Sequence, residues 1–205
     1  MKYQDFKFVL ININYIRKLY EIDKEVFFNQ ALKYELKPYL GILITNNKNE
    51  YAIPLTSAKP KHAKWRDVTE DNYRIYEIID TRITKIKNND VIAPITNTSI
   101  LKVDSCDQIY FKKRILSILE IKKMIPLIKD CYKIVDFNLS SSKEELNRIN
   151  LMKKEYFFCK KIREKILSKA NKIYNYQITT GIIKPFYCNF KLLEQKCMEW
   201  EESHK

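Results

Sequence analysis

The chain has 205 residues, 45% of them hydrophobic and 13% aromatic, which excludes an intrinsically disordered protein and fits one globular domain spanning 1–205. The absence of any apolar run of about 18 residues and of a signal peptide predicts a cytoplasmic protein with no membrane partner. The formal net charge of +13 indicates either a polyanionic partner such as nucleic acid or the lysine-rich composition of an AT-rich genome.

Cysteine, glycine and carboxylate usage exclude several kinds of site. Five cysteines without a Cys-x-x-Cys pair predict neither a disulfide framework nor a zinc site. Two glycines are too few for a glycine-rich phosphate loop or a dinucleotide-binding fold. Asp67, Glu70 and Asp71 lack the spacing of a nuclease metal site, and we interpret them as loop or cap residues. We therefore expect no metal and no cofactor.

The first half of the chain predicts a strand, a short helix and a β-hairpin. Residues 5–11 alternate weakly between apolar and polar side chains, as in a strand, and residues 14–28 follow the helical period of 3.6. Two β-branched runs, 39–45 and 51–56, then flank the turn-forming segment 46–49, which is the pattern of a hairpin.

The middle of the chain predicts further strands. Residues 73–83 and 99–104 are rich in β-forming residues and suggest an inserted or lengthened strand pair within 71–105. Residues 109–119 and 124–137 supply either more strands or a strand followed by a helix.

The last third predicts a long helix and a shorter one. Ser141 and Glu144 form a capping box that opens a helical pattern reaching Ile173, and Gly181 with Pro185 ends this helical region. Asn189 is placed to cap a last helix running through Trp200. The predicted fold class is α+β, with a compact antiparallel, barrel-like core and helices packed beside it.

The end of the second hairpin strand carries the most reactive side chains. Thr56, Ser57, Lys59, Lys61 and His62 follow directly on its apolar run, where strands commonly present functional groups. Prolines at 54 and 60 favour an extended backbone over 53–61, which would place Ser57, Lys59 and Lys61 on one face. Such a hydroxyl between two ammonium groups can grip a phosphate, which favours RNA cleavage without a metal. The alternative is a solvated, lysine-rich strand end.

Other nearby residues are candidates for binding RNA. His62 has the pKa range of a general base, but it could equally contact phosphate or lie idle on the surface. Lys61 and Lys64 are candidate phosphate contacts. Four aromatic residues could stack on unpaired bases, although most aromatics in the chain must belong to the core. They are Tyr15, Tyr34, Tyr39 and Trp65.

Several sequence blocks, in order, resemble the ToxN/AbiQ family of type III toxin–antitoxin endoribonucleases. The Pro-Leu-Thr-Ser-Ala-Lys-Pro-Lys-His motif at 54–62 is preceded by Lys-Pro-Tyr-Leu-Gly at 37–41. Further matching blocks are Asn14-Tyr15-Ile16, Met124-Ile125-Pro126-Leu127, Val135-Asp136-Phe137 and Cys188-Asn189-Phe190-Lys191-Leu192-Leu193-Glu194. The chain departs from the family pattern at Ala58, where proline is typical, and in its longer segment 71–105.

This resemblance implies a metal-independent endoribonuclease toxin with a β-barrel core. It implies attack by the 2′-hydroxyl of the substrate RNA, leaving a 2′,3′-cyclic phosphate, and a role in phage defence. It implies inhibition by a small pseudoknot-like repeat RNA, with toxin and RNA closing into a cyclic hetero-oligomer. The implied catalytic residues are Thr56, Ser57, Lys59, Lys37 and Tyr34. The alternative function is a non-catalytic RNA-binding module that uses the same basic strand end.

Overall fold

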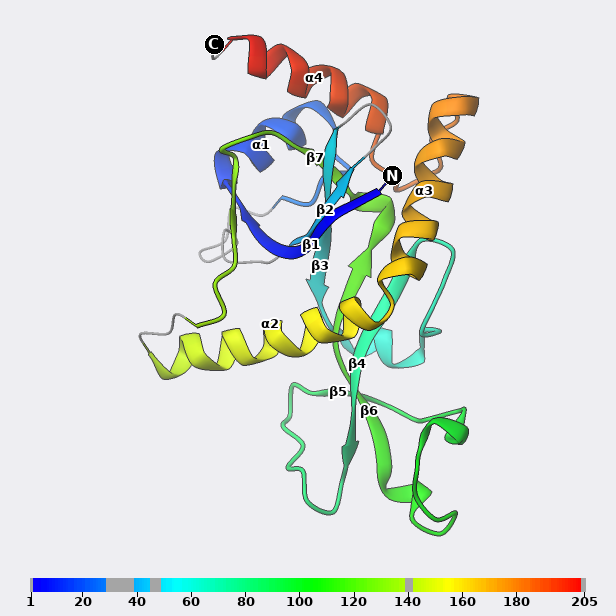
Figure 1. The fold of residues 1–205 in the computed structure, drawn as a ribbon. Helices are drawn as coiled ribbons and strands as arrows, with labels where there is room; N and C mark the ends of the chain where they lie inside the picture. Colours follow the sequence, from blue (N-terminus) through cyan, green and yellow to red (C-terminus); the bar gives the residue numbers. More distant parts are fainter. Residues whose placement is uncertain (1, 29–38, 45–48, 139–141, 204–205) are drawn as a thin grey trace.

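The computed structural model describes residues 2–28, 39–44, 49–138 and 142–203. Within these ranges, helices and antiparallel strands form an α+β fold, as predicted (Figure 1). The strands are β1 (Lys2–Ile11), β2 (Tyr39–Ile44), β3 (Glu50–Ser57), β4 (Asn72–Asp80), β5 (Val91–Ala93), β6 (Phe111–Glu120), β7 (Ile125–Leu127) and β8 (Tyr132–Ile134). The α-helices are α1 (Ile13–Ile22), α2 (Lys143–Lys161), α3 (Arg163–Thr180) and α4 (Phe190–Ser203).

The described strands form an open path. Their order is β4-β6-β3-β2-β1-β8, with β5 paired to β6 and β7 paired to β3. The two ends of this path, β4 and β8, do not pair with each other in the described part of the chain. The barrel-like core predicted from the sequence is therefore not confirmed, whereas the antiparallel sheet is.

Strand β3 lies at the centre of the sheet and changes neighbours along its length. Its first residues, Glu50 to Ala52, pair with β7, and its last, Leu55 to Ser57, pair with β6. On the other side β2 reaches only as far as Pro54, which pairs with Tyr39. Among the described residues, the end of β3 therefore pairs with β6 alone.

The core lies between the sheet and the helices. Tyr51, Phe8 and Phe190 are among its largest fully buried side chains. The Tyr51 hydroxyl donates to Glu194 of α4 at 2.9 Å, and the Tyr174 hydroxyl of α3 donates to the same oxygen at 2.9 Å. These hydrogen bonds satisfy buried polar groups and join β3 to the C-terminal helices.

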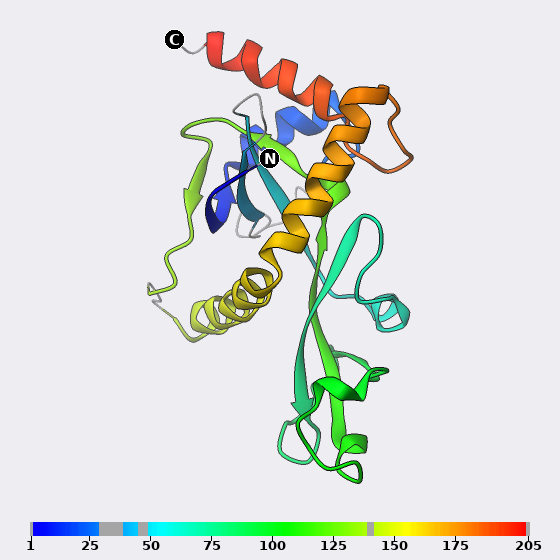
Figure 2. The same cartoon turned by 45° about the vertical axis from the view of Figure 1, so that its right-hand side comes forward.

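The long helix predicted in the last third is two helices. The chain leaves helical geometry at Ile162, between α2 and α3 (Figure 2). Helix α2 is capped by Ser142, whose hydroxyl accepts from the Glu145 N–H at 3.2 Å, one residue after the predicted cap; Ser141 lies outside the described residues. Asn189 caps α4 as predicted, since its side chain accepts from the Leu192 N–H at 3.1 Å.

The C-terminal ends of helices α1 and α3 are both explained by local backbone conformation. Helix α1 is shorter than the predicted 14–28, because the chain turns extended at Asp23. Helix α3 ends at Gly181, which adopts the left-handed conformation with φ 69° that glycine tolerates best. The predicted stop signal at Gly181 is therefore confirmed.

Strands β4 and β6 form an arm that extends away from the helices (Figures 1 and 2). The strand predicted at 73–83 is confirmed as β4, and that at 109–119 as β6. The strand predicted at 99–104 is wrong. The side chain of Asn97 accepts from the Ser99 N–H at 3.1 Å and caps a short 3-10 turn at Thr98–Ile100 instead.

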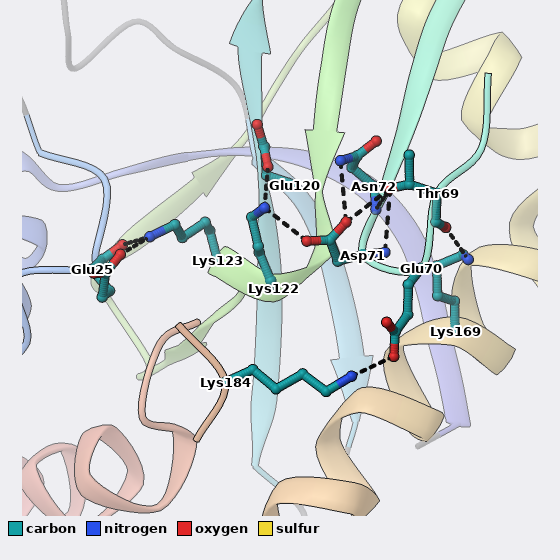
Figure 3. A network of polar contacts seen from close by, with 10 residues as sticks. All are labelled: Glu25, Thr69, Glu70, Asp71, Asn72, Glu120, Lys122, Lys123, Lys169 and Lys184. Atoms are coloured by element: carbon teal, nitrogen blue, oxygen red, sulfur yellow. Dashed lines mark hydrogen bonds and ion pairs between the residues drawn. The ribbon is translucent and has the colours of Figure 1, made fainter. Parts of the chain in front are cut away.

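Ion pairs surround the segment just before β4 and the 3-10 turn at Ile121–Lys123 (Figure 3). Asp71 accepts from Lys122 at 2.7 Å and from the Thr69 hydroxyl at 2.8 Å, Glu70 pairs with Lys184 at 2.5 Å, and Glu25 pairs with Lys123. We call these residues the β4 network.

No helix in the described part of the chain is long and apolar enough to cross a membrane.

Candidate functional site

The end of β3 forms one wall of a large cleft. Ser57 is exposed and Thr56 is half-buried, and they lie opposite Ser117 and Ile118 of β6. The opposite wall is helix α2, and the enclosed volume is about 920 Å³. We call this space the strand-exit cleft. Its size lies within the range of ligand pockets, which is about 300–1,000 Å³.

The chain stays extended for only two residues beyond Ser57. Lys59 is extended, with φ −127° and ψ 155°, and a 3-10 helix, η2 (Pro60–Lys64), begins directly after it. Pro60 is suited to this first helical position because its ring fixes φ. The extended backbone predicted through residue 61 is therefore wrong, and Lys61 does not continue the face of Ser57 and Lys59.

His62 fixes the backbone of Lys59. The imidazole Nδ1 accepts from the Lys59 backbone N–H at 2.9 Å, and the backbone N–H of His62 donates to the Lys59 carbonyl at 2.8 Å. The imidazole is only 3% exposed and packs on Trp65, with ring centroids 4.5 Å apart. Burial, together with the charges of Lys61, Lys59 and Arg74, lowers the pKa of His62, so the ring is neutral at pH 7.

This arrangement corrects the prediction that His62 is a general base or an RNA contact. Its Nδ1 is already engaged, and the remainder of the ring is buried. The residue holds Lys59 in place. Arg74 secures the same turn from β4, because its guanidinium donates to the carbonyls of His62 and Ala63 at 3.0 Å each.

The carboxylates near the site form ion pairs with neighbouring strands and turns. Asp67 pairs with Arg74 at 2.6 Å and with Lys113. Asp71 belongs to the β4 network: burial alone would raise its pKa, but hydrogen bonds from Lys122 and Thr69 outweigh this and lower the pKa. Among the described residues, no three His, Cys, Asp or Glu side chains come together as metal ligands would.

The lysines that follow the cleft have no carboxylate partner among the described residues. Lys59, Lys61 and Lys64 are all exposed, and the Lys61 ammonium lies 5.6 Å from the centre of the Trp65 ring. Three exposed positive charges within six residues make an attractive surface for phosphate. They remain candidate RNA contacts, together with the half-buried Trp65.

Two of the predicted stacking residues belong to the core. Tyr15 is 2% exposed, and its hydroxyl donates to the Pro126 carbonyl at 2.8 Å. Tyr39 is 3% exposed and packs in the same hydrophobic core. Neither ring has a free face for a base, so their assignment to RNA binding is wrong. Tyr34 and Lys37, predicted as catalytic, lie outside the described residues.

Sequence reasoning missed the contribution of α2 and β6 to the cleft. Ser117, Arg148 and Glu155 line it. The sequence does contain a signal for Glu155. Met152, three residues before it, and Cys159, four residues after it, both belong to the apolar stripe of α2. A carboxylate on the buried side of a helix is unusual, and it marks a residue worth examining.

Comparison with known proteins identifies the family of the chain. The family described as Toxin ToxN of type III toxin–antitoxin systems matches residues 7–198, which is nearly the whole chain. The chain belongs to the ToxN family. It is also 27% identical to Endoribonuclease ToxN of Bacillus thuringiensis subsp. kurstaki, a match that covers 96% of this chain and 84% of that protein.

Solved structures share the fold of this ToxN-family chain. One comes from work on type III toxin–antitoxin systems and selective toxin inhibition by a non-coding RNA pseudoknot, with a TM-score of 0.67 and 24% identity, covering 97% of this chain and 99% of that one. Another is AbiQ, a lactococcal anti-phage endoribonuclease of a type III system, with a TM-score of 0.63 and 21% identity over 96% and 98% of the two chains. At these identities the likeness supports the fold.

Proposed function

We propose that this protein is an endoribonuclease toxin of a type III toxin–antitoxin system. The observation that carries the proposal is the strand-exit cleft, where Thr56 and Ser57 present two hydroxyls beside Lys59, an exposed lysine with no carboxylate partner among the described residues. Hydroxyls and an unpaired ammonium group suit the binding of a phosphodiester. The relative from Bacillus thuringiensis bears the name of an endoribonuclease and aligns over almost the entire chain.

Cleavage proceeds in this proposal without a metal ion. Thr56 and Ser57 hydrogen-bond the non-bridging oxygens of the scissile phosphate, and the Lys59 ammonium stabilises the negative charge that grows in the transition state. The 2′-hydroxyl of the adjacent ribose attacks phosphorus, the bond to the 5′-oxygen breaks, and the products carry a 2′,3′-cyclic phosphate and a 5′-hydroxyl. Lys37 and Tyr34 are further proposed catalytic residues.

The same basic surface is proposed to bind an inhibitory RNA. Lys61, Lys64 and Trp65 extend the positive and aromatic surface away from the cleft. A small pseudoknot-like repeat RNA would bind there as the antitoxin and close with the toxin into a cyclic assembly. The protein would act in the cytoplasm against phage, when antitoxin becomes scarce.

Cleavage of a synthetic RNA in EDTA tests the proposal. We expect equal rates in EDTA and in magnesium, with 2′,3′-cyclic phosphate and 5′-hydroxyl ends. An RNA carrying a 2′-deoxyribose at the cut site should remain intact, because it lacks the attacking group. Products with 5′-phosphates, or activity lost on chelation, contradict this mechanism. Tight RNA binding with no cleavage by the wild type supports the alternative, a non-catalytic RNA-binding module.

A further inference from the structure

Helix α2 buries one carboxylate in the strand-exit cleft. Glu155 is only 4% exposed and lines the same cleft as Thr56 and Ser57. No lysine, arginine or histidine pairs with it within the described ranges. Burying a carboxylate without a cation is costly, so its place beside the strand exit is unexpected for a purely structural side chain.

Ser117 of β6 connects this carboxylate to the strand exit. It lies directly opposite Ser57 in the antiparallel register, so the two side chains share one face of the sheet. The Ser117 hydroxyl is buried and has no regular hydrogen bond among the described residues, but it lies near enough to Glu155 to favour the ionised carboxylate. Ser57, Ser117 and Glu155 therefore line one cleft from β3, β6 and α2.

We propose that Glu155 is the general base of the reaction and accepts the proton of the attacking 2′-hydroxyl, while Ser117 orients its carboxylate. The inference rests on the proposed function, since it supplies the proton acceptor for that cleavage. The 2′-oxygen forms its bond to phosphorus as its proton passes to Glu155. The bond to the 5′-oxygen breaks, and this oxygen takes a proton from the Lys59 ammonium. Exchange with water then returns both side chains to their starting states, so no net proton is consumed.

The charge state of Glu155 suits this role. Burial raises its pKa to about 7, and the Ser117 hydroxyl offsets part of the increase. A general base works best when its pKa lies near the working pH, because it is then both available and basic. The hydroxyls of Ser57 and Thr56 cannot take this role, since a hydroxyl needs an adjacent base to activate it.

The charged groups on elements around α2 are mostly engaged elsewhere. Arg114 of β6 pairs with Glu77 at 2.5 Å and with Asp90 at 3.4 Å, and Lys154 of α2 also pairs with Glu77. In the cleft lining, Arg148 of α2 pairs with Glu145 at 3.6 Å, and Glu144 of α2 is a further carboxylate. Other titratable or charged groups on α2 and on the strands packed against it include Lys7, Lys113 and Cys159. None of them contributes to the shift of the Glu155 pKa, which comes from burial.

Replacing the carboxylate by its neutral isostere tests the inference. Glu155→Gln should lower the single-turnover cleavage rate by about 10²–10⁴, the usual contribution of a general base. The wild-type rate should rise with pH and level off near the pKa of about 7, and the variant should lack this rise. Binding of an uncleavable RNA with 2′-deoxyribose at the cut site should be unchanged, which separates chemistry from binding.

Glu194→Gln is the matched control. Glu194 is also buried, at 8% exposure, but it accepts hydrogen bonds from Tyr51 and Tyr174 and does not line the cleft. This variant should be less stable, yet its folded fraction should cleave at the wild-type rate with the wild-type pH profile. The cleavage rate of His62→Asn should still rise with pH. That result would exclude the imidazole as the origin of the rise in rate.

The outcomes distinguish this inference from the proposed function. If the wild type yields 2′,3′-cyclic phosphate and Glu155→Gln cleaves equally fast with the same pH profile, the general base lies elsewhere and the proposed function stands. If the wild type cleaves the 2′-deoxy substrate, the proposed function itself fails. Should Glu155→Gln not fold, the wild-type profile decides, because a rate without any rise towards pH 7 overturns the role of Glu155.

Discussion

The strand-exit cleft and the β4 network use similar side chains in opposite ways. In the β4 network, Lys122, Lys123 and Lys184 each pair with a carboxylate from another part of the chain, and Asp71 accepts from the side chains of Lys122, Thr69 and Asn72 (Figure 3). At the cleft, by contrast, Lys59 has no carboxylate partner and Glu155 has no cation among the described residues.

This difference matters for interpreting a lysine-rich chain. The net charge of +13 does not by itself indicate function, because lysines in ion pairs attract a polyanion only weakly. Charged side chains that lack an ion-pair partner are the better indication of function. A cation without a carboxylate partner and a carboxylate without a cation leave their charges available to a ligand, and such sites are often catalytic.

Removing one unpaired and one paired lysine should separate the two regions by a large difference in cleavage rate. Lys59→Ala should lower RNA cleavage by about 10²–10³, because a preorganised charge at the transition state is lost. Lys184→Ala, which removes an exposed lysine that pairs with Glu70, should leave cleavage unchanged. The measurement is single-turnover cleavage of one synthetic RNA. Equal rates for the two variants would remove the distinction between the regions.

Neutralising one carboxylate in each region should change stability in opposite directions. Folding raises the pKa of Glu155 from 4.5 to about 7, so the wild type loses stability as the pH rises through this interval. At about 1.4 kcal/mol per pKa unit, Glu155→Gln should gain up to about 3 kcal/mol in the free energy of unfolding at pH 8, and nothing near pH 4.

Asp71→Asn should do the reverse. Folding lowers the pKa of Asp71, so its contribution to stability is present above the unfolded pKa and is lost as the pH falls through the folded one. The substitution should cost about 1–2 kcal/mol at pH 7, since it leaves Lys122 with a weaker partner. Urea unfolding at pH 4, 7 and 8 measures both variants. A gain at both sites or a loss at both sites contradicts the comparison.

His62 permits a smaller test of how the cleft is held. His62→Ala removes the acceptor for the Lys59 N–H and should cost about 1 kcal/mol for that hydrogen bond, with slower cleavage. His62→Asn offers an oxygen in a similar place and should restore most of the rate.

The pH dependence of the same site has a defined sign. Because folding lowers the pKa of His62, the neutral ring stabilises the fold above pH 6.5, and this stability is lost as the pH falls. His62→Asn does not titrate, so between pH 6.5 and pH 5 its unfolding free energy should fall less than that of the wild type. Parallel curves for the two proteins would show that folding does not lower the pKa of the imidazole.

Local signals in the sequence predicted local structure well. The hairpin strands β2 and β3, the cap at Asn189 and the stop at Gly181 each depend on a few neighbouring residues. The strand expected at 99–104 failed because Asn97 forms a competing turn. The break at Ile162 has no proline or glycine to announce it.

The site was harder to predict, because it depends on contacts distant in sequence. The segment from Thr56 to Lys59 could be proposed as the site from the sequence, since strand ends and prolines are visible there. Burial decides which aromatic can stack, and the chain alone does not show that Tyr15 is buried while Trp65 is half-exposed. Glu155 lies about a hundred residues from Ser57, and only the packing of α2 brings it to the cleft.

The smallest expected effect concerns the salt dependence of RNA binding. Each lysine that contacts a phosphate releases about one counterion, so removing it should reduce the slope of log affinity against log salt by about one. Lys61→Ala and Lys64→Ala should each show this reduction with an uncleavable RNA, while Lys184→Ala should keep the wild-type slope, because its ammonium is paired with Glu70. Fluorescence anisotropy titrations between about 50 and 300 mM salt provide the comparison. A reduced slope for Lys184→Ala would mean that RNA reaches the β4 network, and the binding surface would then extend across both regions.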